Sequence, residues 1–83
     1  MNPSMEASFS VLVMSIASSA AMSLGLAPNP QTNKLEKDKP MAKFNIDLLV
    51  LLQQKTKNNL SEDESRFLET IVSDLQIKFI DLK

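Results

Sequence analysis

Apolar residues along this chain fall into three blocks with the three-to-four-residue spacing of helices, and polar segments separate the blocks. The first block, residues 7–27, contains no charged residue. It predicts a helix over about residues 3–24, with Asn2 as its N-cap and Pro3 in its first turn. Gly25, the chain's only glycine, predicts the end of this helix because glycine adopts the left-handed backbone conformation with little strain.

The predicted first helix has two different sides. One side carries small residues with scattered larger ones, and small residues let another backbone approach closely. The helix is therefore either a core helix with a serine-rich solvent side or a helix contacted on both sides, once by its own chain and once by a neighbour. The opposite, mainly aliphatic side consists of Phe9, Leu12, Val13, Ile16, Ala20 and Leu24.

Residues 25–39 predict a connector. Pro28 and Pro30 interrupt helical structure, and a polar, mixed-charge run follows them. The connector is long enough for the first helix to reach its own chain or another subunit. Exchange of such an element is a low-cost route to dimers, so both arrangements stay open.

The second block predicts a helix over about residues 40–57 that is apolar around most of its circumference. Its polar strip is narrow, and within it Lys43 and Asp47 have the spacing of a helical ion pair. A helix of this kind is buried from more than one direction, and two other short helices do not suffice to cover it. This helix is the main reason to expect self-association. Asn58 predicts its end, because asparagine tolerates the left-handed conformation.

The third block predicts a helix over about residues 62–82. Ser61 and Glu64 have the spacing of a capping box, in which each side chain accepts a hydrogen bond from the backbone N–H of the other residue. This motif predicts a tight turn after the second helix. The second and third helices are therefore expected to form an antiparallel hairpin.

Together the blocks predict one small all-α domain over residues 1–83, with the first helix packed across the hairpin. The large apolar content of so short a chain favours a homo-oligomer. The contact between subunits is expected to involve the first helix and the wide apolar side of the second. The predicted interface residues are Phe9, Leu12, Val13, Ile16, Ala20, Leu48, Leu49 and Leu52.

The composition removes most catalytic chemistry. The chain has no cysteine and no histidine, which excludes thiolate or imidazole metal ligands, cysteine nucleophiles and the usual neutral-pH proton shuttle. The acidic residues 62–64 are consecutive, so we interpret them as acids at a helix N-terminus rather than as catalytic or Mg²⁺ ligands. We expect no enzyme activity, no cofactor and no metal site.

A nucleic-acid partner is not expected, because nine Lys and Arg residues are balanced by ten Asp and Glu residues. A membrane segment over residues 7–27 is the alternative to a buried helix, since about 20 apolar residues can span a bilayer. Six serines dilute this segment, and residues 1–6 lack the positive charge typical of an export signal. We therefore prefer the buried helix.

Several short sequence patterns point to a known family. They are Leu24-Gly25 with Pro28-Asn29-Pro30, Ile46-Asp47-Leu48-Leu49 with Leu52-Gln53, and Lys55-Thr56-Lys57 with Asn59-Leu60-Ser61 and Glu64. Together they span about Phe9 to Leu82, and the chain resembles the small bacterial domain-of-unknown-function family 1844. Members of that family usually have glycine where this chain has Asn58. The resemblance implies a short, cytoplasmic, helical bacterial protein, and it implies no activity.

The sequence favours a non-enzymatic, self-associating interaction or scaffold module. The alternatives are a small membrane-associated protein and a subunit of a heteromeric assembly. A polar cluster near the turn of the hairpin is either a recognition surface or the polar end of a helical bundle. This cluster consists of Gln53, Gln54, Lys55, Thr56, Lys57 and Asn59.

Overall fold

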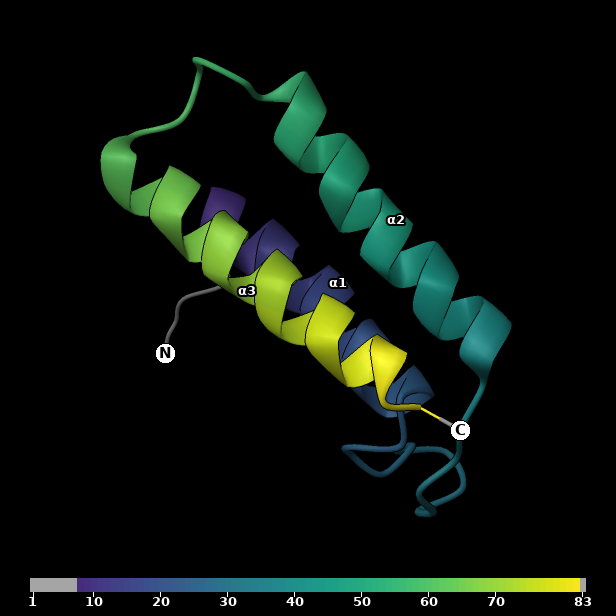
Figure 1. The fold of residues 1–83 in the computed structure, drawn as a ribbon. Coiled ribbons are helices and arrows are strands. Elements are labelled where there is room, and N and C mark those ends of the chain that lie inside the picture. The colour runs from purple at the N-terminus through teal and green to yellow at the C-terminus, as the bar shows by residue number, and fades with distance from the viewer. Residues whose placement is uncertain (1–7, 83) are drawn as a thin grey trace.

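The computed structural model describes residues 8–82, which form the α-helices α1 (Phe9–Ser23), α2 (Lys39–Lys55) and α3 (Glu62–Ile80). In Figure 1, α2 and α3 form a hairpin, and α1 lies behind it. Each of the three helices contacts the other two. The structure confirms the predicted all-α fold, with a helical hairpin and the first helix packed against it.

Helix α1 begins later than the sequence pattern suggests. Ser8 has an extended backbone (φ −147°, ψ 161°), and its hydroxyl oxygen accepts a hydrogen bond from the backbone N–H of Val11 at 3.1 Å. Ser8 is therefore the N-cap. The expected cap Asn2 and first-turn Pro3 lie outside the described residues. The apolar periodicity runs past Ser8 without a break, so periodicity alone does not mark this start.

Gly25 ends α1 as expected, with a φ of 76°. The N–H of Gly25 donates to the carbonyl of Met22, and the N–H of Leu26 donates to that of Ala21. These two bonds form a Schellman motif, which satisfies carbonyls that the helix leaves free. A Cβ atom at position 25 would lie 2.9 Å from the Cγ atom of Lys37, so glycine is also favoured by space.

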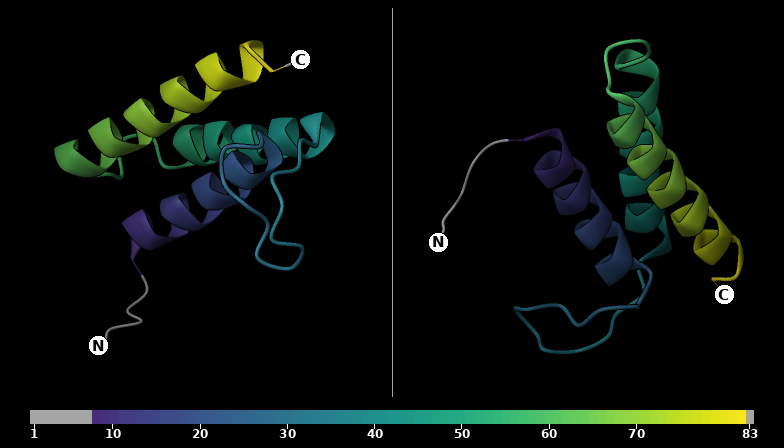
Figure 2. Two further views of the ribbon diagram at one scale, coloured as in Figure 1. Left: turned by 90° about the horizontal axis from the view of Figure 1, so that it is seen from below. Right: turned by 90° about the vertical axis from the view of Figure 1, so that its left-hand side faces the viewer.

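The connector between α1 and α2 folds back on itself. The N–H of Asn29 donates to the carbonyl of Lys34 at 2.9 Å, and Asn33 lies in the left-handed region with a φ of 59°. The N–H of Asp38 donates to the carbonyl of Ser23 at 2.8 Å. This bond brings the start of α2 beside the end of α1, and the intervening loop projects beyond both helices (Figure 2).

Local capping sets the limits of α2 and α3. The Asp38 carboxylate accepts from the N–H of Met41 and starts α2, which ends at Lys55, before the predicted residue 57. Asn58 follows with a φ of 71°. Ser61 and Glu64 make both bonds of the capping box, at 3.1 Å and 2.9 Å. Helix α3 then ends at Ile80, before the predicted residue 82.

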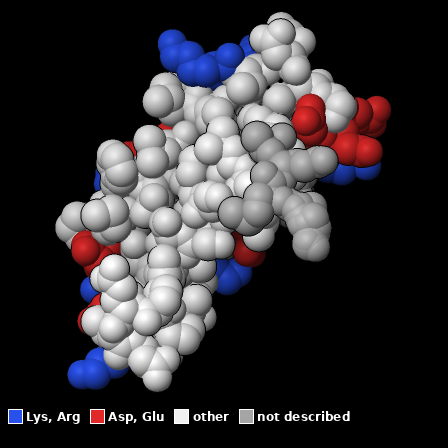
Figure 3. Space-filling view, turned by 180° about the vertical axis from the view of Figure 1, so that it is seen from behind, with Lys and Arg blue, Asp and Glu red and all other residues white. Residues whose placement is uncertain are grey.

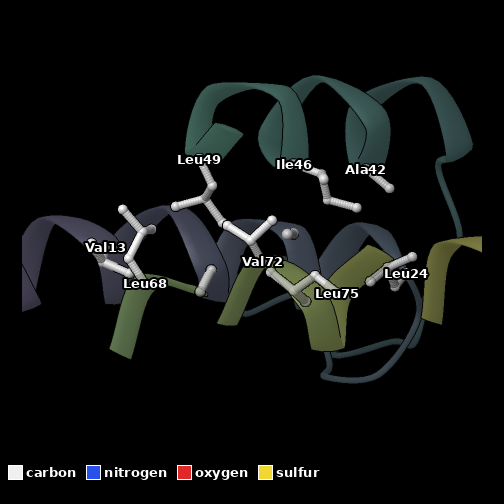
Figure 4. Close-up of a cluster of buried hydrophobic side chains, with 10 residues drawn as sticks. Val13, Leu24, Ala42, Ile46, Leu49, Leu68, Val72 and Leu75 are labelled. Atoms are coloured by element: carbon white, nitrogen blue, oxygen red, sulfur yellow. The ribbon is translucent and has the colours of Figure 1, made fainter. Parts of the chain in front are cut away.

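One hydrophobic core lies between the helices. The side chains from the three helices point toward one another in Figure 4. The molecule measures 36 × 33 × 15 Å along its principal axes. Two layers of helices account for the shortest extent, because axes 8–10 Å apart plus two Cα radii give about 13–15 Å. The buried core residues are Val13, Ala17, Ala20, Leu24, Ala42, Ile46, Leu49, Leu68, Val72 and Leu75.

The capping box gives a direct test of the hairpin turn. Ser61→Ala removes the oxygen that accepts from the N–H of Glu64, so the free energy of unfolding is expected to fall by about 1 kcal/mol. Denaturant unfolding followed by circular dichroism measures this loss. Ser73→Ala, at an exposed position inside α3, is the control and should change stability by less than about 0.5 kcal/mol. Equal effects of the two substitutions would show that the cap does not stabilise α3.

Candidate interaction surface

Helix α2 leaves a row of large apolar side chains on its outer side. Met41, Phe44 and Leu51 are exposed, and Leu48 between them is half-buried. The spacing of three, four and three residues places all four side chains along one side of the helix. We name these four residues the α2 stripe. The largest of them, Phe44, has 57% of its surface exposed.

The α2 stripe faces outward because a second apolar row on the same helix faces inward. Ala42, Ile46 and Leu49 are buried in the core. Between the two rows, on one flank, the Lys43 ammonium and the Asp47 carboxylate form an ion pair at 2.8 Å that is largely exposed. Exposed pairs of this kind stabilise a helix by only a few tenths of a kcal/mol. The exposed apolar row is therefore the distinctive feature of α2.

Helix α1 has an outer side without charged residues, which we name the α1 face. It comprises the exposed Val11, Leu12 and Met14 together with Ser15 and Ser18. The view from behind shows a broad uncharged area on the molecule (Figure 3). We expect this area to bind apolar surface more readily than a charged helix side would.

Three of the serines in α1 make it less polar than its composition suggests. The hydroxyl of Ser15 donates to the carbonyl of Val11, that of Ser19 to Ser15, and that of Ser23 to Ser19. The hydroxyl protons of these three serines are therefore used within the helix. Such bonds to the preceding turn let serine sit in a helix without requiring water as an acceptor.

A hollow of about 320 Å³ joins the edges of α1 and α2. Ser19 and Met22 line it from α1, and Met41 and Asn45 line it from α2. Asn45 is itself buried, and its side-chain amide donates to the carbonyl of Met41 at 3.0 Å. The N-terminal end of the α2 stripe thus lies beside the edge of α1.

Three residues of the predicted interface lie inside the chain, and the contact between subunits stays a prediction. Val13, Ala20 and Leu49 are completely buried inside the chain, so they cannot contact a second copy in this conformation. A helical wheel defines the sides of a helix but does not show which side faces the core. Of the other predicted residues, Leu12 is exposed, and those that are half-buried are Phe9, Ile16, Leu48 and Leu52.

The predicted interface did not include Met41, Phe44 and Leu51, which are exposed on α2. The sequence does contain a signal for the inward sides of α1 and α2. This signal is the position of their alanines. Ala17 and Ala20 of α1 and Ala42 of α2 are all buried. Small side chains allow close helix packing, which the bulky α2 stripe would prevent.

The hairpin tip contains a larger hollow of about 810 Å³. Of the predicted tip cluster, Gln53, Gln54, Thr56 and Lys57 line it. The Thr56 hydroxyl donates to the carbonyl of Leu52 at 2.7 Å. The Ser61 hydroxyl and the Arg66 guanidinium, which also line the hollow, are engaged in the capping box and in an ion pair with Glu62. These polar groups of the tip are therefore used in the turn that connects α2 to α3.

Two further observations concern chemistry and membranes. Among residues 8–82, no group of three or more acidic side chains is placed to hold a metal ion. None of the helices described is long and apolar enough to cross a bilayer, and α1 has 15 residues where about 20 are needed.

The fold and this surface define a small three-helix protein with outward-facing apolar helix sides. The model of the family described as "Domain of unknown function (DUF1844)" matches residues 6–81. The chain belongs to this family, which confirms the resemblance seen in its sequence patterns. No curated protein and no solved structure matches the chain.

The inward orientation of Leu49 can be tested by truncation. Leu49→Ala creates a cavity in the core, so the free energy of unfolding should fall by about 2–5 kcal/mol. Ile77→Ala on the outer side of α3, where 60% of the side chain is exposed, should cost less than about 0.5 kcal/mol. Thermal or denaturant unfolding compares the two variants. A loss at position 49 no larger than at position 77 would contradict the orientation of α2.

Proposed function

We propose that this protein is a non-enzymatic helical interaction module that associates with copies of itself through the α2 stripe and the α1 face. The observation that supports this proposal most directly is the exposed row Met41, Phe44 and Leu51 on α2. A bacterial, cytoplasmic setting is part of the proposal and follows from the family resemblance.

The energetic argument concerns apolar surface in water. Transferring one large apolar side chain from water to a buried contact is favourable by about 1.5–3 kcal/mol. Single exposed apolar residues are common on proteins, but a continuous row of them marks an interaction site. Domains of this size also often depend on oligomerisation for part of their stability. Self-association would bury the row without any other component.

The proposal predicts that the purified protein forms a multimer in solution. Light scattering over a range of concentrations should give a mass above that of the 9.2 kDa chain. The double variant Val11→Asp/Phe44→Asp places charges on both apolar sides at exposed positions, so it should keep its helical content. Its dissociation constant should rise about 100-fold or more, because a dimer contains each substitution twice.

Ile77→Asp is the matched control, since it introduces the same charge at an exposed apolar position on α3. It should leave the mass unchanged. A wild-type protein that stays monomeric at high concentration would rule out self-association and would favour a heteromeric assembly instead. Loss of association in Ile77→Asp alone would place the contact on α3 and contradict the proposed surfaces.

A further inference from the structure

We propose that two copies of this chain pair through their α2 stripes, with the two α2 helices antiparallel and the two-fold axis between them, level with residue 46. This inference rests on the proposed self-association and goes further, because it names the surface, the direction and the register of the contact.

The first support is the symmetry of the spacing. The steps between Met41, Phe44, Leu48 and Leu51 are the same read in either direction along the chain. An antiparallel pairing centred at residue 46 places Met41 opposite Leu51 of the second copy, and Phe44 opposite Leu48 of the second copy. Every member of the stripe then meets another apolar side chain, as a self-complementary two-fold interface requires.

Burial within the stripe agrees with this register. Phe44 is the largest and is well exposed, whereas Leu48 is half-buried and therefore more recessed. The pairing sets each protruding phenylalanine against the recessed leucine of the second copy. Such alternation of protruding and recessed side chains is the way that helices with a three-four spacing interlock.

The ends of the stripe distinguish the two directions further. Lys55 lies seven residues after Leu48, so it continues the stripe at its C-terminal end. A parallel pairing would bring Lys55 against Lys55 of the second copy. The antiparallel pairing brings it instead level with position 37 of the second copy, where Glu36 and Asp38 line the hollow beside Met41 and the side chain of Lys37 lies against Gly25.

Lys39, the first residue of α2, is also engaged within its own chain. The Lys39 ammonium lies over the Phe79 ring, 5.5 Å from its centroid. Antiparallel α2 helices also place the partial positive end of one helix dipole beside the partial negative end of the other. The charges and dipoles at the helix ends therefore favour the antiparallel pairing, as the spacing of the stripe does.

The absence of cysteine from the chain makes the register testable by cross-linking. Met41→Cys and Leu51→Cys are prepared as two separate full-length proteins, one of them isotopically labelled, then mixed and oxidised. The antiparallel pairing brings these two positions together, so the mixed disulfide should be the main product. Ile77→Cys, at an exposed position on α3, is the control and should form no mixed disulfide with either protein.

A second measurement leaves the stripe intact. A spin label on Lys55→Cys, at an exposed position, should show two labels separated by about 27 Å along the helix direction, from nine residues on each side of the axis at about 1.5 Å per residue. A parallel pairing would bring the labels to within about one interhelical distance, 8–10 Å, before label length is added. Pulsed electron paramagnetic resonance distinguishes these values.

The outcomes separate this inference from the function on which it rests. Homodisulfides at both positions, with short distances between the labels, would establish a parallel pairing and overturn the register. A wild-type multimer with neither cross-links nor a defined label distance would place the contact away from the α2 stripe, and self-association would still stand. A wild-type monomer at all concentrations would overturn both.

Discussion

The thickness of the molecule is the constraint on which its other features depend. Its shortest extent of 15 Å leaves room for two layers of helices, so each helix can bury only one side. Helix α2 is apolar around most of its circumference. Burying Ala42, Ile46 and Leu49 therefore leaves Met41 and Phe44 in water. The exposed row is a geometric consequence of folding three short helices around a single core.

The backbone at the end of α1 decides which side of α2 faces inward. The Schellman motif at Gly25 stops α1, and the hydrogen bond from Asp38 to Ser23 starts α2 beside it. With the helix ends held together, the closest approach must occur where side chains are small. Ala20 and Ala42 provide that space, and Phe44 in the same place would force the helices apart.

Local signals in the sequence predicted the fold well, but they did not show which side of each helix faces the core. Gly25, Asn58 and the Ser61–Glu64 capping box each act through their own backbone geometry, so the sequence predicted their roles and the structure places them accordingly. The inward side of a helix instead depends on contacts between distant segments. The predicted interface therefore included Leu49, which is buried in the core.

The two outward surfaces differ in how they can hold a partner. On the α1 face, Ser15 and Ser18 interrupt the apolar residues, and the Ser15 hydroxyl donates to the carbonyl of Val11 in the preceding turn. The α2 stripe has an aromatic residue and no polar interruption between Met41 and Leu51 on its side of the helix. Because burial of large side chains dominates association, the α2 stripe is expected to supply most of the binding energy. The hollow lined by Met22 and Met41 joins the two surfaces, so a second copy on α2 would also reach the edge of α1.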